Sequence, residues 1–264
     1  MSFIKGTLVA LVVFAFTLVG FHSYHPILKD TPQISQATVD VFLTFTGEIG
    51  DSGDTLKVVM TGYGQGFALT PTLVLTAKHV VVPPDKINLL GWDIPLHASD
   101  IKILALSRHQ DSKGYYKWIE ASLVWTAPDD DLALIRLKEP VPFYWNYFAK
   151  ADLYDKVFFV NSLIVQEGYL VEGKVIGIGF CPLEAENKLD DLPMFKDADK
   201  KFCKDDFLVL DLDSISGDSG SAILDRYGRI VAIVSIGWKY VVCTPVYKYT
   251  KIIESHIAKD LALR

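Results

Sequence analysis

Asp211-Leu-Asp-Ser-Ile-Ser-Gly-Asp-Ser-Gly-Ser-Ala-Ile-Leu224 joins two apolar segments in the C-terminal part of the sequence. The runs Phe-Leu-Val-Leu before it and Ile-Val-Ala-Ile-Val after it indicate a strand on each side. Gly217 and Gly220 flank Ser219 and allow backbone conformations that most residues resist. Such a turn presents a serine hydroxyl and directs backbone N–H groups at the point where an oxyanion would form. The alternative is an ordinary hairpin turn, because Gly, Asp and Ser are common turn residues.

Short apolar or alternating runs recur in the preceding part of the chain, separated by turn residues. They lie at 39–45, 56–60, 67–70, 73–76, 123–126 and 132–137. Many short strands with frequent turns predict an antiparallel barrel or sandwich. The 264 residues, half of them hydrophobic, suffice for one sizeable domain or two small ones. The net charge of −6 gives no indication of nucleic-acid binding.

Two further polar residues stand beside predicted strands. His79 directly follows the strand at 73–76, at the start of a short helical turn. The acidic run 129–131 precedes the strand at 132–137, and Asp131, nearest the apolar residues, is the one expected to point inward. Taken singly, a half-buried structural imidazole and a solvated acidic turn explain these residues equally well.

Together the three motifs resemble those of chymotrypsin/trypsin-like serine peptidases, of the bacterial type without an appended PDZ domain. Thr76-Ala-Lys-His79 resembles that family's Thr-Ala-x-His, and Asp131-Leu-Ala-Leu-Ile resembles its Asp-x-x-Leu-Leu. Gly217-Asp-Ser-Gly-Ser221 resembles Gly-Asp-Ser-Gly-Gly and departs from it at Ser221. The order His, Asp, Ser is also the family's, with separations of 52 and 88 positions.

The resemblance implies an all-β fold with two antiparallel six-stranded β-barrels packed around a cleft, followed by a C-terminal α-helix. It divides the peptidase into an N-terminal barrel at 39–148 and a C-terminal barrel with its helix at 149–264. It also implies a serine endopeptidase that cuts peptides or proteins through an acyl-enzyme and uses no cofactor. The alternative is a catalytically inactive member that acts as a binding or scaffold protein at the membrane.

The same resemblance assigns roles to individual residues. Ser219 is the expected nucleophile, His79 its general base and Asp131 the residue that orients His79. The N–H groups of Gly217 and Ser219 are expected to form the oxyanion hole. The expected substrate-binding residues are Asp213, Ser214, Ser235, Ile236 and Gly237.

Either of two carboxylates could select the residue before the cleaved bond. Asp213 stands six residues before Ser219, where an Asp in trypsin-like members selects Arg or Lys. Asp211 is the alternative, and strand alternation puts both on the same face. Asp218 pairs with a new N-terminal amine in zymogen-type members, but the sequence contains no recognisable activation site before the first strand.

Two helices are predicted outside the barrels. Residues 1–24 contain an uncharged apolar run after Lys5 and predict an N-terminal hydrophobic helix, which anchors the chain with the peptidase outside the cytoplasm. The alternative is a cleaved signal peptide and a secreted or periplasmic protein. Residues 25–38 read as a linker. At the other end, residues 249–264 predict an amphipathic helix with apolar residues at Ile252, Ile253, Ile257 and Leu261.

The cysteines leave their pairing undetermined. Cys181, Cys203 and Cys243 include no Cys-x-x-Cys pair and the histidines are scattered, so no metal site is predicted. One disulfide with a leftover thiol and three buried free thiols are both compatible with the sequence.

Overall fold

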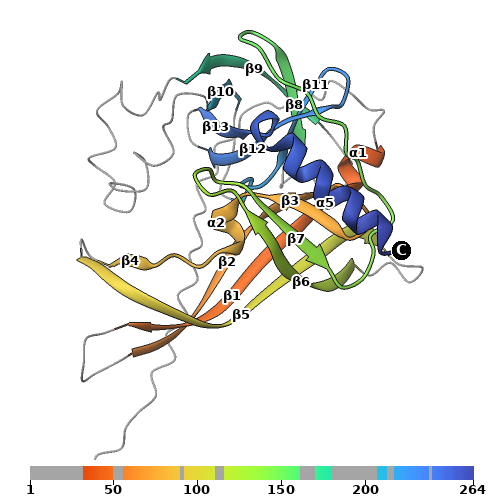
Figure 1. The fold of residues 1–264 in the computed structure, drawn as a ribbon. Coiled ribbons are helices and arrows are strands. Elements are labelled where there is room, and N and C mark those ends of the chain that lie inside the picture. The colour runs from red at the N-terminus through yellow and green to blue at the C-terminus, as the bar shows by residue number, and fades with distance from the viewer. Residues whose placement is uncertain are drawn as a thin grey trace, which may run out of the picture.

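The fold is dominated by β-strands (Figure 1). A computed structural model describes residues 32–49, 56–89, 92–110, 116–160, 170–179, 207–212, 217–237 and 240–264. Its described helices are α1 (Pro32–Gln36), α2 (Lys78–Val81), the 3₁₀ turn η3 (Tyr247–Tyr249) and α5 (Thr250–Ala262). The predicted all-β class is confirmed.

The first barrel is built from the N-terminal strands. In order around the ring they are β1 (Thr38–Ile49), β2 (Leu56–Ala68), β3 (Leu73–Thr76), β7 (Ala133–Leu137), β6 (Tyr116–Thr126) and β5 (Trp92–Gln110). Antiparallel pairing of β1 with β5 closes the six-stranded ring, and β4 (Lys86–Leu89) extends β5 outside it.

The second barrel contains the C-terminal strands. Its closed order is β10 (Leu208–Asp211), β13 (Val241–Pro245), β12 (Ile230–Gly237), β11 (Ala222–Asp225), β8 (Lys156–Val160) and β9 (Leu170–Ile178). The predicted pair of six-stranded antiparallel barrels is therefore confirmed, and the predicted division at residue 148 falls between β7 and β8.

The segment around Ser219 is not a hairpin turn. It leaves β10, which pairs with β13 and β9, and enters β11, which pairs with β12 and β8. Because β10 and β11 are not neighbours, the segment has to pass from one part of the second barrel to another. This leaves its polar residues available for contacts other than a local turn.

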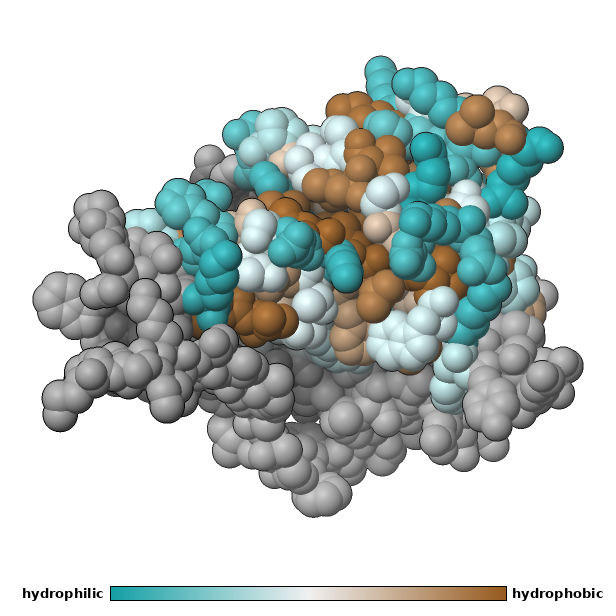
Figure 2. Space-filling model, turned by 90° about the horizontal axis from the view of Figure 1, so that it is seen from below, coloured by the Kyte–Doolittle hydropathy of each residue, from teal (hydrophilic) through white to brown (hydrophobic). Residues whose placement is uncertain are grey.

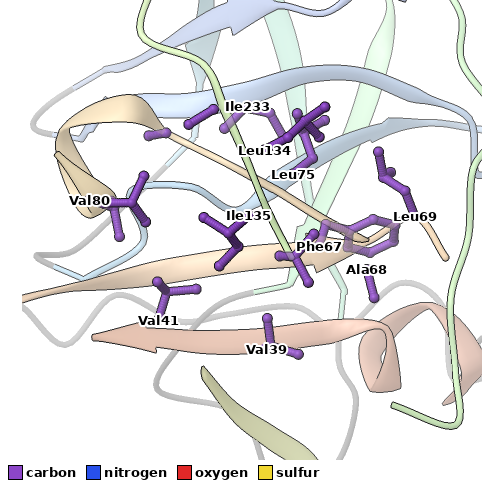
Figure 3. Packing of buried hydrophobic residues seen from close by; sticks show 14 of the residues in the cluster. Val39, Val41, Phe67, Ala68, Leu69, Leu75, Val80, Leu134, Ile135 and Ile233 are labelled. Carbon is purple, nitrogen blue, oxygen red and sulfur yellow. The ribbon is translucent and has the colours of Figure 1, made fainter. Parts of the chain in front are cut away.

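Alternation of apolar residues explains how β1 builds the core. Val39, Val41, Leu43 and Phe45 are at most 3% exposed, whereas the residues between them are only partly buried. Figure 3 shows Val39 and Val41 facing Phe67 of the adjacent strand β2 and Ile135 of the more distant strand β7. Each fully buried side chain of this size contributes roughly 1.5–3 kcal/mol of transfer free energy.

Outside the core, one face of the molecule has hydrophobic residues in its middle, bordered by hydrophilic ones (Figure 2).

The C-terminal helix α5 packs on the first barrel, beside β3 and β7 in Figure 1. Ile253 and Ile257 are buried as predicted, but Ile252 and Leu261 are 42% and 44% exposed. The predicted apolar stripe was wrong at those two positions because the inner face follows residues 253, 257 and 260. Asp260 occupies this face with only 3% exposure.

Two predictions concern the N-terminal part of the chain, an anchor at 1–24 and a linker at 25–38. The predicted anchor at 1–24 lies outside the described residues, and among the helices that are described none is long and apolar enough to cross a membrane. The end of the predicted linker differs from expectation: α1 forms there, and Ile34, 3% exposed, joins the larger core cluster, which contains residues of both barrels.

Of the cysteines, Cys181 and Cys203 lie outside the described residues. Cys243, on β13, is a buried free thiol, and burial raises its pKa well above the usual range. A free thiol at this position agrees with either alternative drawn from the sequence.

Candidate active site

His79 and Asp131 form a closely matched pair. His79 lies on α2, directly after β3, and Asp131 precedes β7, which pairs with β3. The His79 Nδ1 lies 2.7 Å from Asp131 Oδ2, and the His79 backbone N–H donates to Oδ1 at 2.9 Å. Because an ionised carboxylate only accepts hydrogen bonds, Nδ1 carries the proton and Nε2 is left as an acceptor. Asp131 is buried as predicted, with 6% exposure, but it is not the only buried residue of the acidic run.

Asp130, which the sequence did not single out, is buried to the same extent. Its Oδ2 accepts hydrogen bonds from the Tyr249 hydroxyl at 2.7 Å and from Lys248 Nζ at 3.1 Å. Burial and the adjacent Asp130 carboxylate together raise the pKa of Tyr249 well above its usual range. The two consecutive carboxylates thus have separate partners. Asp131 accepts hydrogen bonds from His79, and Asp130 accepts them from Lys248 and Tyr249, which directly precede α5.

The glycines beside Ser219 adopt the conformations for which the sequence suggested them. Gly217 and Gly220 have φ values of +103° and +89°. A Cβ on Gly220 would lie 1.9 Å from the Gln65 carbonyl oxygen, so no larger residue fits without movement of the backbone. The Gly220 N–H donates to the carbonyl of Val234 on β12 at 2.8 Å, which fixes the turn to the second barrel.

Gln65, on β2, connects the Ser219 segment to the first barrel. Its N–H donates to the Ser219 carbonyl at 2.7 Å, and its side-chain Oε1 accepts a hydrogen bond from the Ser221 hydroxyl at 2.8 Å. The Gln65 carbonyl in turn accepts from the Thr76 hydroxyl at 2.5 Å. Ser221, where the motif departs from the family pattern, therefore forms a buried link between the two barrels.

Gly64 marks the point where the Ser219 segment meets the helix that carries His79. A Cβ on Gly64 would lie 2.6 Å from the Ser219 carbonyl oxygen and 2.6 Å from Val80 Cγ2. Val80 directly follows His79 on α2, where Figure 3 shows its side chain at the edge of the core cluster. The helix that carries His79, which is hydrogen-bonded to Asp131, therefore lies next to the Ser219 segment.

The end of β12 lies on the other side of Ser219. The Ser219 hydroxyl donates to the carbonyl of Ser235 at 3.4 Å, and the buried Ser235 hydroxyl lies 2.7 Å from the hydroxyl of Thr244. Ile236 and Gly237 continue the strand and are partly buried. A register shift between Val234 and Ile236 marks an irregularity of the kind often found next to active sites.

Of the two candidate specificity carboxylates, only Asp211 lies within the described residues. Asp213 and Ser214 lie outside the described residues. Asp211 is exposed at the end of β10, opposite Lys174 of β9. Within the described ranges, no group of three His, Cys, Asp or Glu side chains is arranged to hold a metal ion.

Comparison with known proteins places these residues within one family domain. A family model described as "Trypsin-like peptidase domain" matches residues 64–233, which include His79, Asp131 and Ser219. No curated protein matches the sequence. Among solved structures, Deg5 aligns with a TM-score of 0.52 at 19% identity, covering 84% of this chain and 88% of Deg5. Rv3671c from M. tuberculosis H37Rv aligns with a TM-score of 0.49 at 16% identity, over 92% of this chain and 98% of that protein. The likeness to Deg5 supports the same fold.

Proposed function

The chain belongs to the trypsin-like serine peptidases, and on that premise we propose that it is an endopeptidase whose triad is His79, Asp131 and Ser219. The observation that carries this proposal is the double hydrogen bond from His79 to Asp131, formed on a helix that packs against the Ser219 segment. A carboxylate that fixes an imidazole next to a serine is the arrangement that makes a hydroxyl nucleophilic.

In the proposed reaction, the Ser219 hydroxyl turns from the Ser235 carbonyl towards Nε2 of His79. Its oxygen attacks the scissile carbonyl carbon while Nε2 takes its proton, and Asp131 stabilises the resulting imidazolium without becoming protonated. The N–H groups of Gly217 and Ser219 stabilise the oxyanion; losing one such donor costs roughly 100- to 1000-fold in rate. His79 then protonates the leaving amine, and a water molecule hydrolyses the acyl-enzyme by the same steps.

Covalent labelling with a fluorophosphonate probe tests this assignment. We expect mass mapping to place the label on Ser219, and we expect the label to be lost in Ser219→Ala. Circular dichroism of both proteins separates loss of the nucleophile from loss of the fold. A folded wild-type protein that takes no label and does not digest denatured casein would refute the proposal.

We further propose that Asp213, with Ser214, directs cleavage after Arg or Lys. The support is the position of Asp213 six residues before Ser219, together with the surface location of its rival Asp211. A set of peptides differing only at the residue before the scissile bond measures this preference. Equal kcat/KM values for peptides with Arg, Lys, Leu or Ala before the scissile bond would refute the proposed preference for Arg and Lys.

The membrane attachment is likewise a proposal, supported by the apolar run within residues 1–24. We propose that this segment anchors the peptidase outside the cytoplasm, with secretion after signal cleavage as the alternative. Membrane fractionation followed by N-terminal sequencing distinguishes them. A full-length chain in the cytoplasmic fraction contradicts both.

A further inference from the structure

Three aromatic side chains form a continuous strip on the outer face of the first barrel. The ring of Phe42 on β1 lies between those of Tyr63 on β2 and Trp118 on β6, tilted against both, with ring centroids 4.9 Å apart in each pair. Tyr63 and Trp118 are 42% and 53% exposed, although they belong to the class of side chain that gains most from burial. We call these three residues the aromatic strip.

The strip begins at the candidate oxyanion hole. A Cβ on Gly217 would lie 2.5 Å from Cε1 of Tyr63, so the tyrosine ring packs directly on this glycine. The Tyr63 hydroxyl donates to Asp40 Oδ1 at 3.3 Å, which holds the ring from its other end. A polypeptide whose scissile carbonyl lies at the Gly217 N–H must therefore pass within contact distance of Tyr63.

The position of the strip also indicates which part of a substrate reaches it. β12, in the second barrel, contacts the Ser219 hydroxyl, whereas β2, in the first barrel, contacts the Ser219 carbonyl. If the residues before the scissile bond run beside Ser235–Gly237, as expected, the residues after it are directed towards β2. The strip spans at most about 10 Å from Tyr63 to Trp118, which is about three residues of an extended chain.

We propose that the aromatic strip binds aromatic or large aliphatic side chains in the first three residues on the C-terminal side of the cleaved bond. This rests on the proposed endopeptidase function and names part of its substrate class: extended polypeptide segments rich in hydrophobic residues. Contacts between aromatic rings add about 0.5–1.5 kcal/mol beyond area burial, equivalent to about a two- to tenfold preference in kcat/KM.

The test is a cleavage profile measured on an unbiased set of peptides. A peptide library made from a denatured cell lysate is digested with the wild-type enzyme, and mass spectrometry records the residues on both sides of each cleaved bond. We expect aromatic residues to be enriched about two- to tenfold within three positions after the bond. Trp118→Ala is expected to abolish the enrichment at the third position after the cleaved bond, and Trp118→Phe is expected to retain it. The preference for residues before the bond should be the same in both variants as in the wild type.

Tyr227→Ala is the matched control, because Tyr227 is 63% exposed on the β11–β12 turn of the second barrel. It should give the wild-type profile. A flat wild-type profile after the bond, or an enrichment that survives Trp118→Ala, overturns the inference while the endopeptidase function stands. Dissociation of a dimer by Trp118→Ala with an unchanged profile also overturns it, because the strip is then a self-association surface. Failure to cut any peptide or to accept the fluorophosphonate label rejects the endopeptidase function and the inference with it.

Discussion

Replacing Asp260 with alanine should destabilise the whole fold, because this residue joins α5 to the first barrel. Its carboxylate accepts hydrogen bonds from the Thr70 hydroxyl at 2.6 Å, the Thr72 hydroxyl at 2.8 Å and Arg136 Nε at 3.1 Å. Both threonines lie in the connection between β2 and β3, close in sequence to the strand that leads to His79. Asp260→Ala removes the acceptor of all three bonds.

The expected cost follows from the burial of each partner. Removing one member of a buried charged pair costs about 3–5 kcal/mol, but the Arg136 side chain is 37% exposed and can regain water. The Thr70 hydroxyl is fully buried and cannot, which costs about 1–3 kcal/mol. We therefore expect a loss of about 3 kcal/mol in the free energy of unfolding, or a fall in Tm of about 6–12 °C for a protein of this size.

Urea unfolding followed by tryptophan fluorescence and far-ultraviolet circular dichroism measures this loss. Glu254→Ala is the control, since it removes an exposed carboxylate from the same helix and should change the free energy of unfolding by at most about 0.5 kcal/mol. A loss below about 1 kcal/mol for Asp260→Ala, or an equal loss for Glu254→Ala, would show that the three hydrogen bonds do not hold the helix to the barrel.

Three other predictions concern acid stability and the site. Burial raises the pKa of the Asp260 carboxyl, but its hydrogen bonds outweigh this and hold that pKa below the usual range. The stability that Asp260 contributes is therefore present above about pH 4 and is lost as the pH falls through the lowered pKa. The difference in the free energy of unfolding between wild type and Asp260→Ala should become smaller at pH 3, and a difference that does not change with pH contradicts this. Asp131→Asn should lower kcat roughly 10⁴-fold in a folded protein by favouring the wrong tautomer of His79, and near-normal turnover of a peptide substrate would rule out this role. Gly220→Ala should destabilise the protein by at least about 2 kcal/mol and abolish labelling of Ser219, because its φ is +89° and a Cβ meets the backbone of Gln65; normal labelling would show that the turn can relax.

Predictions from the sequence succeeded where a local pattern reflects a local cause. The run at 39–45 predicted a strand, and β1 forms there with alternate residues buried, because each strand of a small barrel turns one face to the core. The hydrophobic run after Asp131 likewise located β7 and the burial of Asp131, but not the equal burial of Asp130. In both cases the neighbouring residues in the chain carry enough information to fix burial.

Residues whose partners lie far away in the sequence were missed. Gln65 accepts a hydrogen bond from Ser221, 156 positions away, and nothing in the local sequence Gly-Gln-Gly predicts that partner. Asp130 was read as part of a solvated turn and Asp260 was not singled out, because acidic residues are rarely buried unless paired. The same omission explains the error at Ile252 and Leu261: the inner face of α5 includes a carboxylate that only the tertiary structure satisfies.

The packing of α5 on the first barrel also has a consequence for biosynthesis. The strands of the first barrel leave the ribosome long before α5 does, yet Asp260 and Tyr249 supply the partners of Thr70 and Asp130. A nascent chain that has released both barrels but not this helix lacks the contacts that hold the segments flanking His79 and Asp131. Because Tyr249 and Asp260 are synthesised after both barrels, Thr70 and Asp130 gain these hydrogen-bond partners last during synthesis of the chain.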